Sequence, residues 1–182
     1  RDQAFALKEE GNAFARQGLK EEALQKYEKG IRILGFTDYR VDEDCAKVVE
    51  LLGRDGRELL SVLASNAAQM YMDEDLKKLS LAIERCSLAI EVNPANAKAL
   101  FRRALASHDH AENVAKGSDA LLAQAQQDVR QFLQIDPRSP AGRELEEKLV
   151  RRRHVLQPPI LREKLQFGPS AVPEWFDEVS KR

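Results

Sequence analysis

The chain has 182 residues, of which 43% are hydrophobic and 32% charged, and its formal net charge is −1. This composition is typical of a globular protein, and the near-neutral charge argues against a nucleic-acid-binding surface. Without a signal peptide or a long apolar run, the sequence favours neither secretion nor membrane insertion, and it indicates a cytoplasmic protein.

Small residues recur at matching offsets along the chain, with a bulkier residue between them and often a proline after them. Small residues let two antiparallel helices approach closely, the bulkier side chains fill the gap, and proline ends the second helix. This spacing predicts three helix-turn-helix units. Its members are Gly11, Ala23, Tyr27 and Gly30 in the first unit, Ala82, Cys86, Ala89 and Pro94 in the second, and Ala125, Val129, Phe132 and Pro137 in the third.

Two stretches interrupt the regular spacing, and we interpret both as insertions. The first lies near residues 36–57, where Asp42-Glu43-Asp44-Cys45 leads into an apolar helical stretch before the second unit. The second is expected to be a hairpin at 108–118 within the third unit, with Ser118 and Asp119 as caps of the next helix.

The C-terminal part begins with one more expected helix. Ser139 followed by Pro140 has the order of an N-cap and a first helical residue, and Leu145, Leu149 and Val150 form an apolar stripe. We therefore predict an all-α solenoid with a capping helix over residues 1–153 and a tail over 154–182. Because the tail contains Trp175-Phe176, we expect segment 166–182 either to pack on the solenoid or to dock a second partner.

No motif in the sequence indicates catalysis, a cofactor or a metal. There is no glycine-rich phosphate loop, no His-Glu-x-x-His and no nucleophile elbow. His108 and His110 are alternate residues, which point to different sides of a helix, so a solvated loop is favoured over a metal site. Cys45 and Cys86 lack metal-like spacing and are expected to be reduced thiols. We predict a protein that is not an enzyme.

Polar residues recur at one phase of the expected first helices. Lys8 and Asn12 are four residues apart and share a face, as do Lys98 and Arg102, and Asn66 has the same phase in the second unit. Three cations and two amides, with no acid among them, suit the binding of carboxylates because charged donors and directional amides together replace the water around an anion. Phe101 and Leu105 are expected to add an apolar wall.

The spacing resembles the tetratricopeptide repeat, a helix-turn-helix unit of about 34 residues. The five polar residues match the carboxylate clamp of family members that bind the C-terminal Glu-Glu-Val-Asp of heat-shock protein 90 and cytosolic heat-shock protein 70. The resemblance implies the following roles. The terminal main-chain carboxylate would be held by Lys8, Asn12 and Asn66, the side chain of the last Asp by Lys98, and the peptide upstream by Arg102.

We predict a non-catalytic co-chaperone adaptor, and two alternative functions remain open. The large insertion and the long extension of a second helix resemble the repeat domains of large immunophilins, so the chain is either a co-chaperone adaptor or the targeting domain of a larger enzyme such as a peptidyl-prolyl isomerase. A scaffold that binds another acidic peptide is the third possibility. The sequence does not choose between heat-shock proteins 90 and 70.

Overall fold

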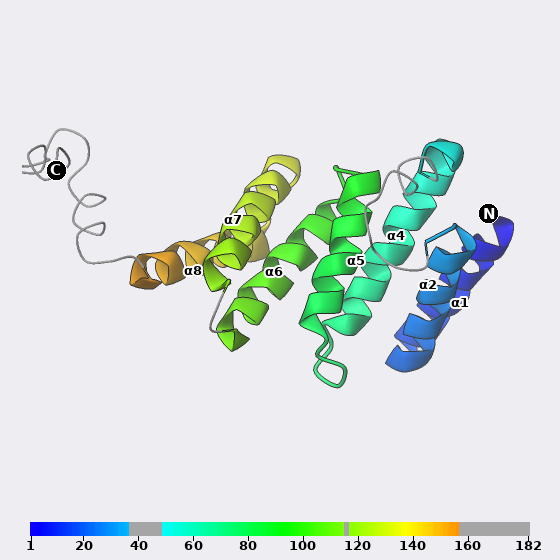
Figure 1. The fold of residues 1–182 in the computed structure, drawn as a ribbon, viewed down its shortest axis with the longest axis horizontal. Helices are drawn as coiled ribbons and strands as arrows, with labels where there is room; N and C mark the ends of the chain where they lie inside the picture. The colour runs from blue at the N-terminus through cyan, green and yellow to red at the C-terminus, as the bar shows by residue number, and fades with distance from the viewer. Residues whose placement is uncertain (37–48, 115–116, 157–182) are drawn as a thin grey trace, which may run out of the picture.

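The computed structural model describes residues 1–36, 49–114 and 117–156, and this part of the chain contains helices and turns but no strand (Figure 1). The expected all-α class is confirmed. The helices are α1 (Asp2–Arg16), α2 (Lys20–Ile33), α4 (Gly53–Tyr71), α5 (Leu79–Val92), α6 (Ala97–Asn113), α7 (Ser118–Ile135) and α8 (Pro140–Leu156).

The helices form a row of hairpins. The helices of each pair, α1–α2, α4–α5 and α6–α7, pack against each other. The second helix of each pair also packs on the helix that follows it: α2 on α4, α5 on α6 and α7 on α8. The first helices α1, α4 and α6 contact their neighbours in turn, and α8 covers α7 at the end of the row. This is the solenoid of helical hairpins with a capping helix that the repeat spacing predicts.

The small residues lie where the paired helices come closest. Ala23, Ala82 and Ala125 are completely buried. A Cβ atom added to Gly11 would lie 2.5 Å from Cε1 of Tyr27, so α1 and α2 can adopt this separation only with glycine at that position. The interpretation of the repeat as a packing pattern is therefore confirmed at these contacts.

Polar groups also connect successive hairpins inside the solenoid. Asn96 caps α6 by accepting a hydrogen bond from the backbone N–H of Ala99 at 3.0 Å, and its Nδ2 donates to Oγ of Ser61 at 2.8 Å. The Ser61 hydroxyl donates in turn to the carbonyl oxygen of Ala89 at 2.8 Å. Because this relay joins α4, α5 and α6, it fixes how the second and third hairpins meet.

The structure corrects the extent of both insertions. Residues 53–57, expected within the first insertion, form the start of α4, while residues 37–48 lie outside the described part of the chain. The expected hairpin at 108–118 is wrong for most of its length, because α6 continues to Asn113 and α7 begins at Ser118. Ala104 and Ala111 are both buried against α7, so extending the helix prolongs the hairpin's packed face.

The caps of the last two helices differ in how well the sequence predicted them. Gly117 is the N-cap of α7, with φ of 84°, and no side chain caps this helix, so the expected capping by Ser118 or Asp119 is wrong. At α8 the prediction is confirmed, since Oγ of Ser139 accepts a hydrogen bond from the backbone N–H of Gly142 at 3.3 Å.

The described part of the chain ends with α8, which continues past residue 153 to Leu156. Cys45 and the tail residues Trp175 and Phe176 lie outside the described residues, so the predictions about the tail stay predictions. Cys86 is a free, buried cysteine, and burial raises the pKa of its thiol to about 12.

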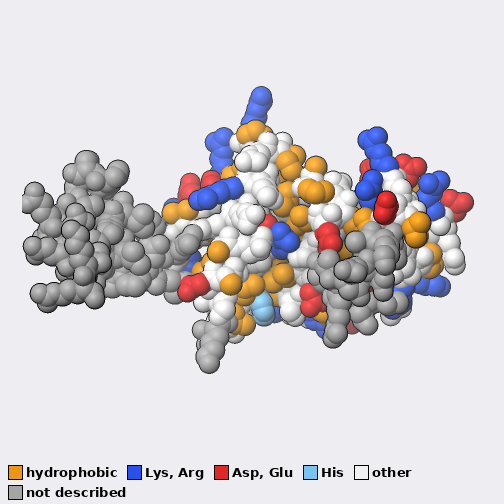
Figure 2. Space-filling model, turned by 45° about the horizontal axis from the view of Figure 1, so that its top comes forward, with side chains coloured by type: hydrophobic (Ala, Val, Ile, Leu, Met, Phe, Trp, Pro, Cys, Tyr) orange, Lys and Arg blue, Asp and Glu red, His pale blue; other side chains and the backbone are white. Residues whose placement is uncertain are grey.

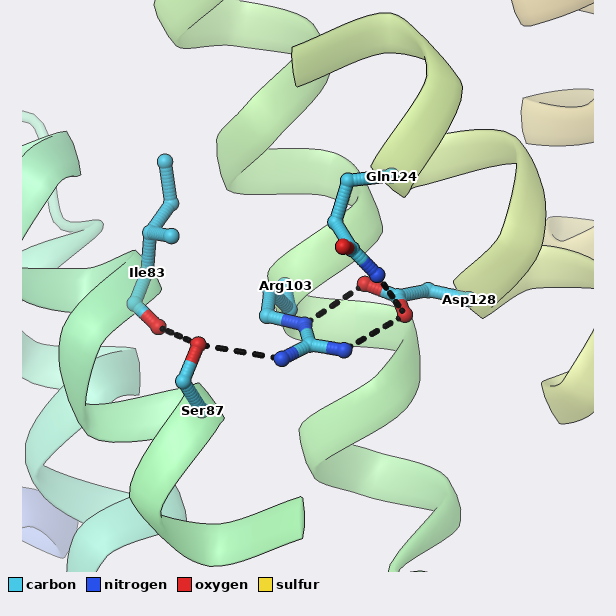
Figure 3. Close-up of polar contacts among 5 residues, drawn as sticks. All are labelled: Ile83, Ser87, Arg103, Gln124 and Asp128. Carbon is cyan, nitrogen blue, oxygen red and sulfur yellow. Dashed lines mark hydrogen bonds and ion pairs between the residues drawn. The ribbon is translucent and has the colours of Figure 1, made fainter. Parts of the chain in front are cut away.

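A buried ion pair joins three helices (Figure 3). Asp128 of α7 is completely buried, and Arg103 of α6 donates to both of its carboxylate oxygens at 2.7 Å. Gln124 donates to the same carboxylate at 3.0 Å, and Nη1 of Arg103 donates to the Ser87 hydroxyl of α5 at 3.0 Å. This arrangement satisfies a charge that would otherwise be costly to bury.

We expect Arg103→Ala to lower the free energy of unfolding by about 3–5 kcal/mol, because the carboxylate of Asp128 would remain buried without its cation. Urea denaturation followed by circular dichroism measures the change. Lys148→Ala serves as the control, since Lys148 pairs with Glu144 on the exposed side of α8 and its removal should leave the midpoint unchanged. Equal midpoints for the two variants would contradict the role given to the buried pair.

Candidate carboxylate-binding site

The five polar residues expected to bind carboxylates lie on the first helices of the three hairpins. Lys8 and Asn12 belong to α1, Asn66 to α4, and Lys98 and Arg102 to α6. Because α1 contacts α4 and α4 contacts α6, these helices lie side by side. The structure joins α1 to α4 through a direct contact of the two asparagines, and it joins α4 to α6 through Arg102.

The Asn12 side chain is held from two directions. Its Oδ1 accepts a hydrogen bond from the hydroxyl of Tyr27 at 2.9 Å and another from Nδ2 of Asn66 at 3.3 Å. Burial raises the pKa of the Tyr27 hydroxyl, while the charges of Arg102 and Arg16 act in the opposite direction. The tyrosine therefore stays a protonated donor at neutral pH.

Arg102 is anchored on the neighbouring hairpin. Its Nη1 donates to the backbone carbonyl and to the hydroxyl of Ser65, at 2.8 and 2.7 Å, and its Nε donates to Oε1 of Gln69 at 2.9 Å. Burial lowers the pKa of Arg102, yet a guanidinium remains charged at any physiological pH. These contacts hold its positive charge beside α4, one residue away from Asn66.

Lys8 has an acidic partner, which corrects the expectation of a site without acids. Its Nζ lies 2.9 Å from a carboxylate oxygen of Glu9 and 4.2 Å from the centre of the Phe5 ring. The pKa of Glu9 is lowered first by its hydrogen bond to Lys8 and also by Asn12. The carboxylate of Glu9 thus interacts with two of the residues expected to bind a ligand's carboxylate.

The remaining predicted residues have different surroundings. Lys98 is exposed in the first turn of α6, one helical turn before Arg102. The ring of Phe101 packs against Phe132 of α7 in a tilted arrangement, with centroids 5.2 Å apart and planes inclined at 47°. Leu105 packs on the same core between α6, α7 and α8. Both apolar side chains are half-buried, so they contribute to packing and leave only part of their surface for a ligand.

A hollow of about 350 Å³ lies next to Lys8, at the N-terminal ends of α1 and α4. Its lining includes the apolar side chains of Phe5, Leu59 and Val62 and the carboxylates of Asp55 and Glu58. Nothing in the repeat spacing indicated this hollow, because Phe5 and Glu58 are exposed helical residues with no special pattern. The hollow adjoins the candidate site at Lys8.

Charges of both signs are mixed on the surface. On the face drawn in Figure 2, basic and acidic side chains alternate, with hydrophobic side chains between them. No field of one sign extends across the described part of this face.

The described residues offer neither a metal site nor a membrane-spanning helix. They contain no group of three His, Cys, Asp or Glu side chains placed to hold a metal ion. None of the described helices has both the length and the apolar character required to cross a bilayer.

Little in the sequence indicated the side chains that support the site. Tyr27 was recognised only as a packing residue, and Ser65 only as the neighbour of Asn66. Gln69 and Glu9 carried no signal that separates them from ordinary exposed residues. Their roles depend on which long side chains meet after the helices have packed.

We expect Lys8→Ala to raise the pKa of Glu9 toward its ordinary value, because the mutation removes the strongest interaction that favours the ionised carboxylate. Carbon-detected NMR titration of the glutamate side chains measures it. Glu144 is the internal control, since Lys148 lowers its pKa and is retained in this variant. A Glu9 titration identical to that of the unmodified protein would show that the Lys8–Glu9 pair does not persist in solution.

Comparison with known proteins gives relatives but no matching family model. PHOX3 of Arabidopsis thaliana is 32% identical over 137 residues, which are 74% of this chain and 15% of that protein. The peptidyl-prolyl cis-trans isomerase FKBP4 of Bos taurus is 29% identical over 142 residues, or 78% of this chain and 27% of that enzyme. The chain therefore spans well under a third of the length of these curated relatives.

Solved structures match nearly the whole described fold. The first TPR domain of Spaghetti (RPAP3), bound to the HSP90 peptide SRMEEVD, has a TM-score of 0.56 and 25% identity, covering 82% of this chain and 94% of that one. The chain is a tetratricopeptide repeat domain. A Plasmodium falciparum FK506-binding protein's TPR-containing domain shares the TPR fold, with a TM-score of 0.64 and 21% identity over 90% and 93% of the two chains.

Proposed function

We propose that this TPR domain is a non-catalytic co-chaperone adaptor that binds the C-terminal Glu-Glu-Val-Asp of heat-shock protein 90 or 70. The observation that carries the proposal is the contact of Asn12 with Asn66, next to Lys8 on one side and Arg102 on the other. The Spaghetti domain, similar in fold and sequence, is bound to a peptide with the same four C-terminal residues. Because both chaperones present this terminus in the cytosol, we propose that the domain acts there.

The division of labour follows from charge and geometry. A free C-terminal aspartate carries two carboxylates on one residue, and their water must be replaced by donors of comparable strength. We assign the main-chain carboxylate to Lys8, Asn12 and Asn66 and the aspartate side chain to Lys98, which is exposed and one turn from Arg102. The two amides add directional donors without adding repulsion among the cations.

Arg102 has two roles, and the sequence indicated only the first. We assign it to the peptide upstream of the last residue, where its guanidinium meets main-chain carbonyls or acidic side chains. Its bonds to Ser65 and Gln69 also tie α6 to α4. An Arg102→Ala variant would therefore lose stability together with affinity, which makes Lys8 the sharper position for a test.

We expect a synthetic peptide ending in Glu-Glu-Val-Asp to bind the domain, and Lys8→Ala to weaken it by about 2–3 kcal/mol, the usual result of truncating one partner of a charged contact. Isothermal calorimetry with the free-acid peptide and its C-terminal amide measures both the affinity and its dependence on the carboxylate. Lys148→Ala, on the outer side of α8, is the matched control and should bind as the unmodified domain does. Equal affinity for acid and amide would instead favour a scaffold for another acidic peptide.

The affinity should depend on salt. A short flexible peptide that is ordered by a few charged contacts is expected to bind with about −7 to −8 kcal/mol, in the micromolar range. Because screening acts over about 8–10 Å near physiological ionic strength, raising the salt concentration should weaken binding severalfold without abolishing it. A titration series at increasing sodium chloride checks this, and an affinity independent of salt would point to an apolar ligand.

A second candidate is that the domain directs an enzyme to which it is joined in a longer protein. The similarity to FKBP4 favours it, since the matched residues are 27% of a protein named as a peptidyl-prolyl isomerase. The sequence surrounding this domain in the full-length protein decides between an adaptor and the targeting part of an enzyme.

A further inference from the structure

Tyr27 makes two contacts with α1, one through its ring and one through its hydroxyl. Its ring lies against Gly11, where the missing Cβ leaves the room that the ring occupies. The same ring places the hydroxyl 2.9 Å from Oδ1 of Asn12, the residue after Gly11. The packing of α2 on α1 therefore also determines what the asparagine side chain can do.

The hydrogen bonds at Asn12 define which end of its amide is available. A carboxamide oxygen has two lone pairs, and Oδ1 of Asn12 accepts from Tyr27 and from Asn66. Both acceptor positions are thus used inside the protein. The Nδ2 group, which carries the two donor hydrogens, is left on the other side of the amide, where the carboxylate of Glu9 already accepts a hydrogen bond from the Asn12 side chain. A ligand's carboxylate, which can only be bound by donors, would use the same group.

We propose that Tyr27 is a positioning residue for carboxylate recognition, because its hydroxyl fixes the Asn12 amide with Nδ2 directed to the ligand. The inference rests on the proposed function of the groove, since it assigns Asn12 a ligand that accepts hydrogen bonds. Without the tyrosine hydroxyl, the amide can rotate and present Oδ1, which repels a carboxylate.

A purely structural role predicts something different. A buried tyrosine hydroxyl generally needs a hydrogen-bond partner, and Asn12 could serve only to satisfy it. The two roles differ in what happens when the hydroxyl is removed and the ring retained. A structural role would change stability alone, whereas a positioning role changes the preference for a free carboxylate over an amide.

The chain offers a matched control for this substitution. Tyr71 of α4 is also buried, and its hydroxyl donates to a carboxylate oxygen of Glu28 at 3.1 Å. Burial raises its pKa to about 12, so it too remains a protonated donor. Its partner Glu28 is bound by Arg85 and is not among the residues assigned to the ligand.

The test compares Tyr27→Phe with Tyr71→Phe by calorimetry, using the Glu-Glu-Val-Asp peptide as free acid and as C-terminal amide. Tyr27→Phe should weaken binding of the acid by about three- to tenfold, the value of one ordinary hydrogen bond, and leave the amide nearly unaffected. Tyr71→Phe should keep the full ratio between acid and amide. In an Asn12→Ala background, Tyr27→Phe should have no further effect on affinity, because the group that it positions is gone.

A ligand-free readout accompanies the binding data. In the unmodified domain the two Nδ2 protons of Asn12 should give one sharp pair of NMR signals, and in Tyr27→Phe these signals should broaden or move, since the amide gains freedom to rotate. The same signals should be unchanged in Tyr71→Phe.

The possible failures are distinguishable. Equal binding of acid and amide by the unmodified domain would overturn the proposed function. A clear preference of the unmodified domain for the acid, retained in full by Tyr27→Phe, would overturn the positioning role alone. The positioning role would also be overturned if Tyr27→Phe weakened binding of the acid as much in the Asn12→Ala background as in the unmodified domain. The tyrosine would then act through another group.

Discussion

The contact between the ring of Tyr27 and the bare α-carbon of Gly11 is the constraint on which the first hairpin and the candidate site both depend. A methyl group at Gly11 would lie 2.5 Å from the ring, a distance that close-packed atoms do not tolerate, so any side chain there would force the ring of Tyr27 or the two helices to shift. The hydroxyl would then move away from Asn12. Close packing and the geometry of the proposed carboxylate site thus depend on one interhelical distance.

Contacts between hairpins extend this order along the solenoid. The relay from Asn96 through Ser61 to Ala89 joins the second and third hairpins. Arg103, which pairs with Asp128 inside the third hairpin, also donates to Ser87 of the second one. Apolar packing alone has little directional preference, whereas an unpaired buried polar group is costly. These bonds therefore restrict the angle between hairpins. They also keep α4 and α6 close enough for Arg102 of α6 to reach Ser65 of α4.

The polar residues of the site differ in how much freedom the free protein leaves them. Arg102 is already held by Ser65 and Gln69, so binding of a ligand would cost little conformational entropy at this side chain. The same bonds make the arginine contribute to the packing of α6 on α4. Lys8 interacts with Glu9, an exposed carboxylate on the same helix. A ligand's carboxylate must compete with Glu9 for this lysine, whereas it can approach Lys98 directly.

The repeat and the helix faces could be predicted from the sequence. Regular offsets of small residues place Ala23, Ala82 and Ala125 at buried contacts, and four-residue spacing places Lys8 with Asn12 and Lys98 with Arg102, because the helical period is a local property of the backbone. The prediction misjudged residues 108–113, where an apparent insertion lengthens α6, since a longer helix and an inserted loop add the same number of residues. The contacts between long side chains became clear only in the folded structure: Tyr27 with Asn12 and Ser65 with Arg102 across helices, and Lys8 with Glu9 within α1. Those partners depend on the separation and angle of packed helices and on the rotamers of long side chains, and no local spacing records either one.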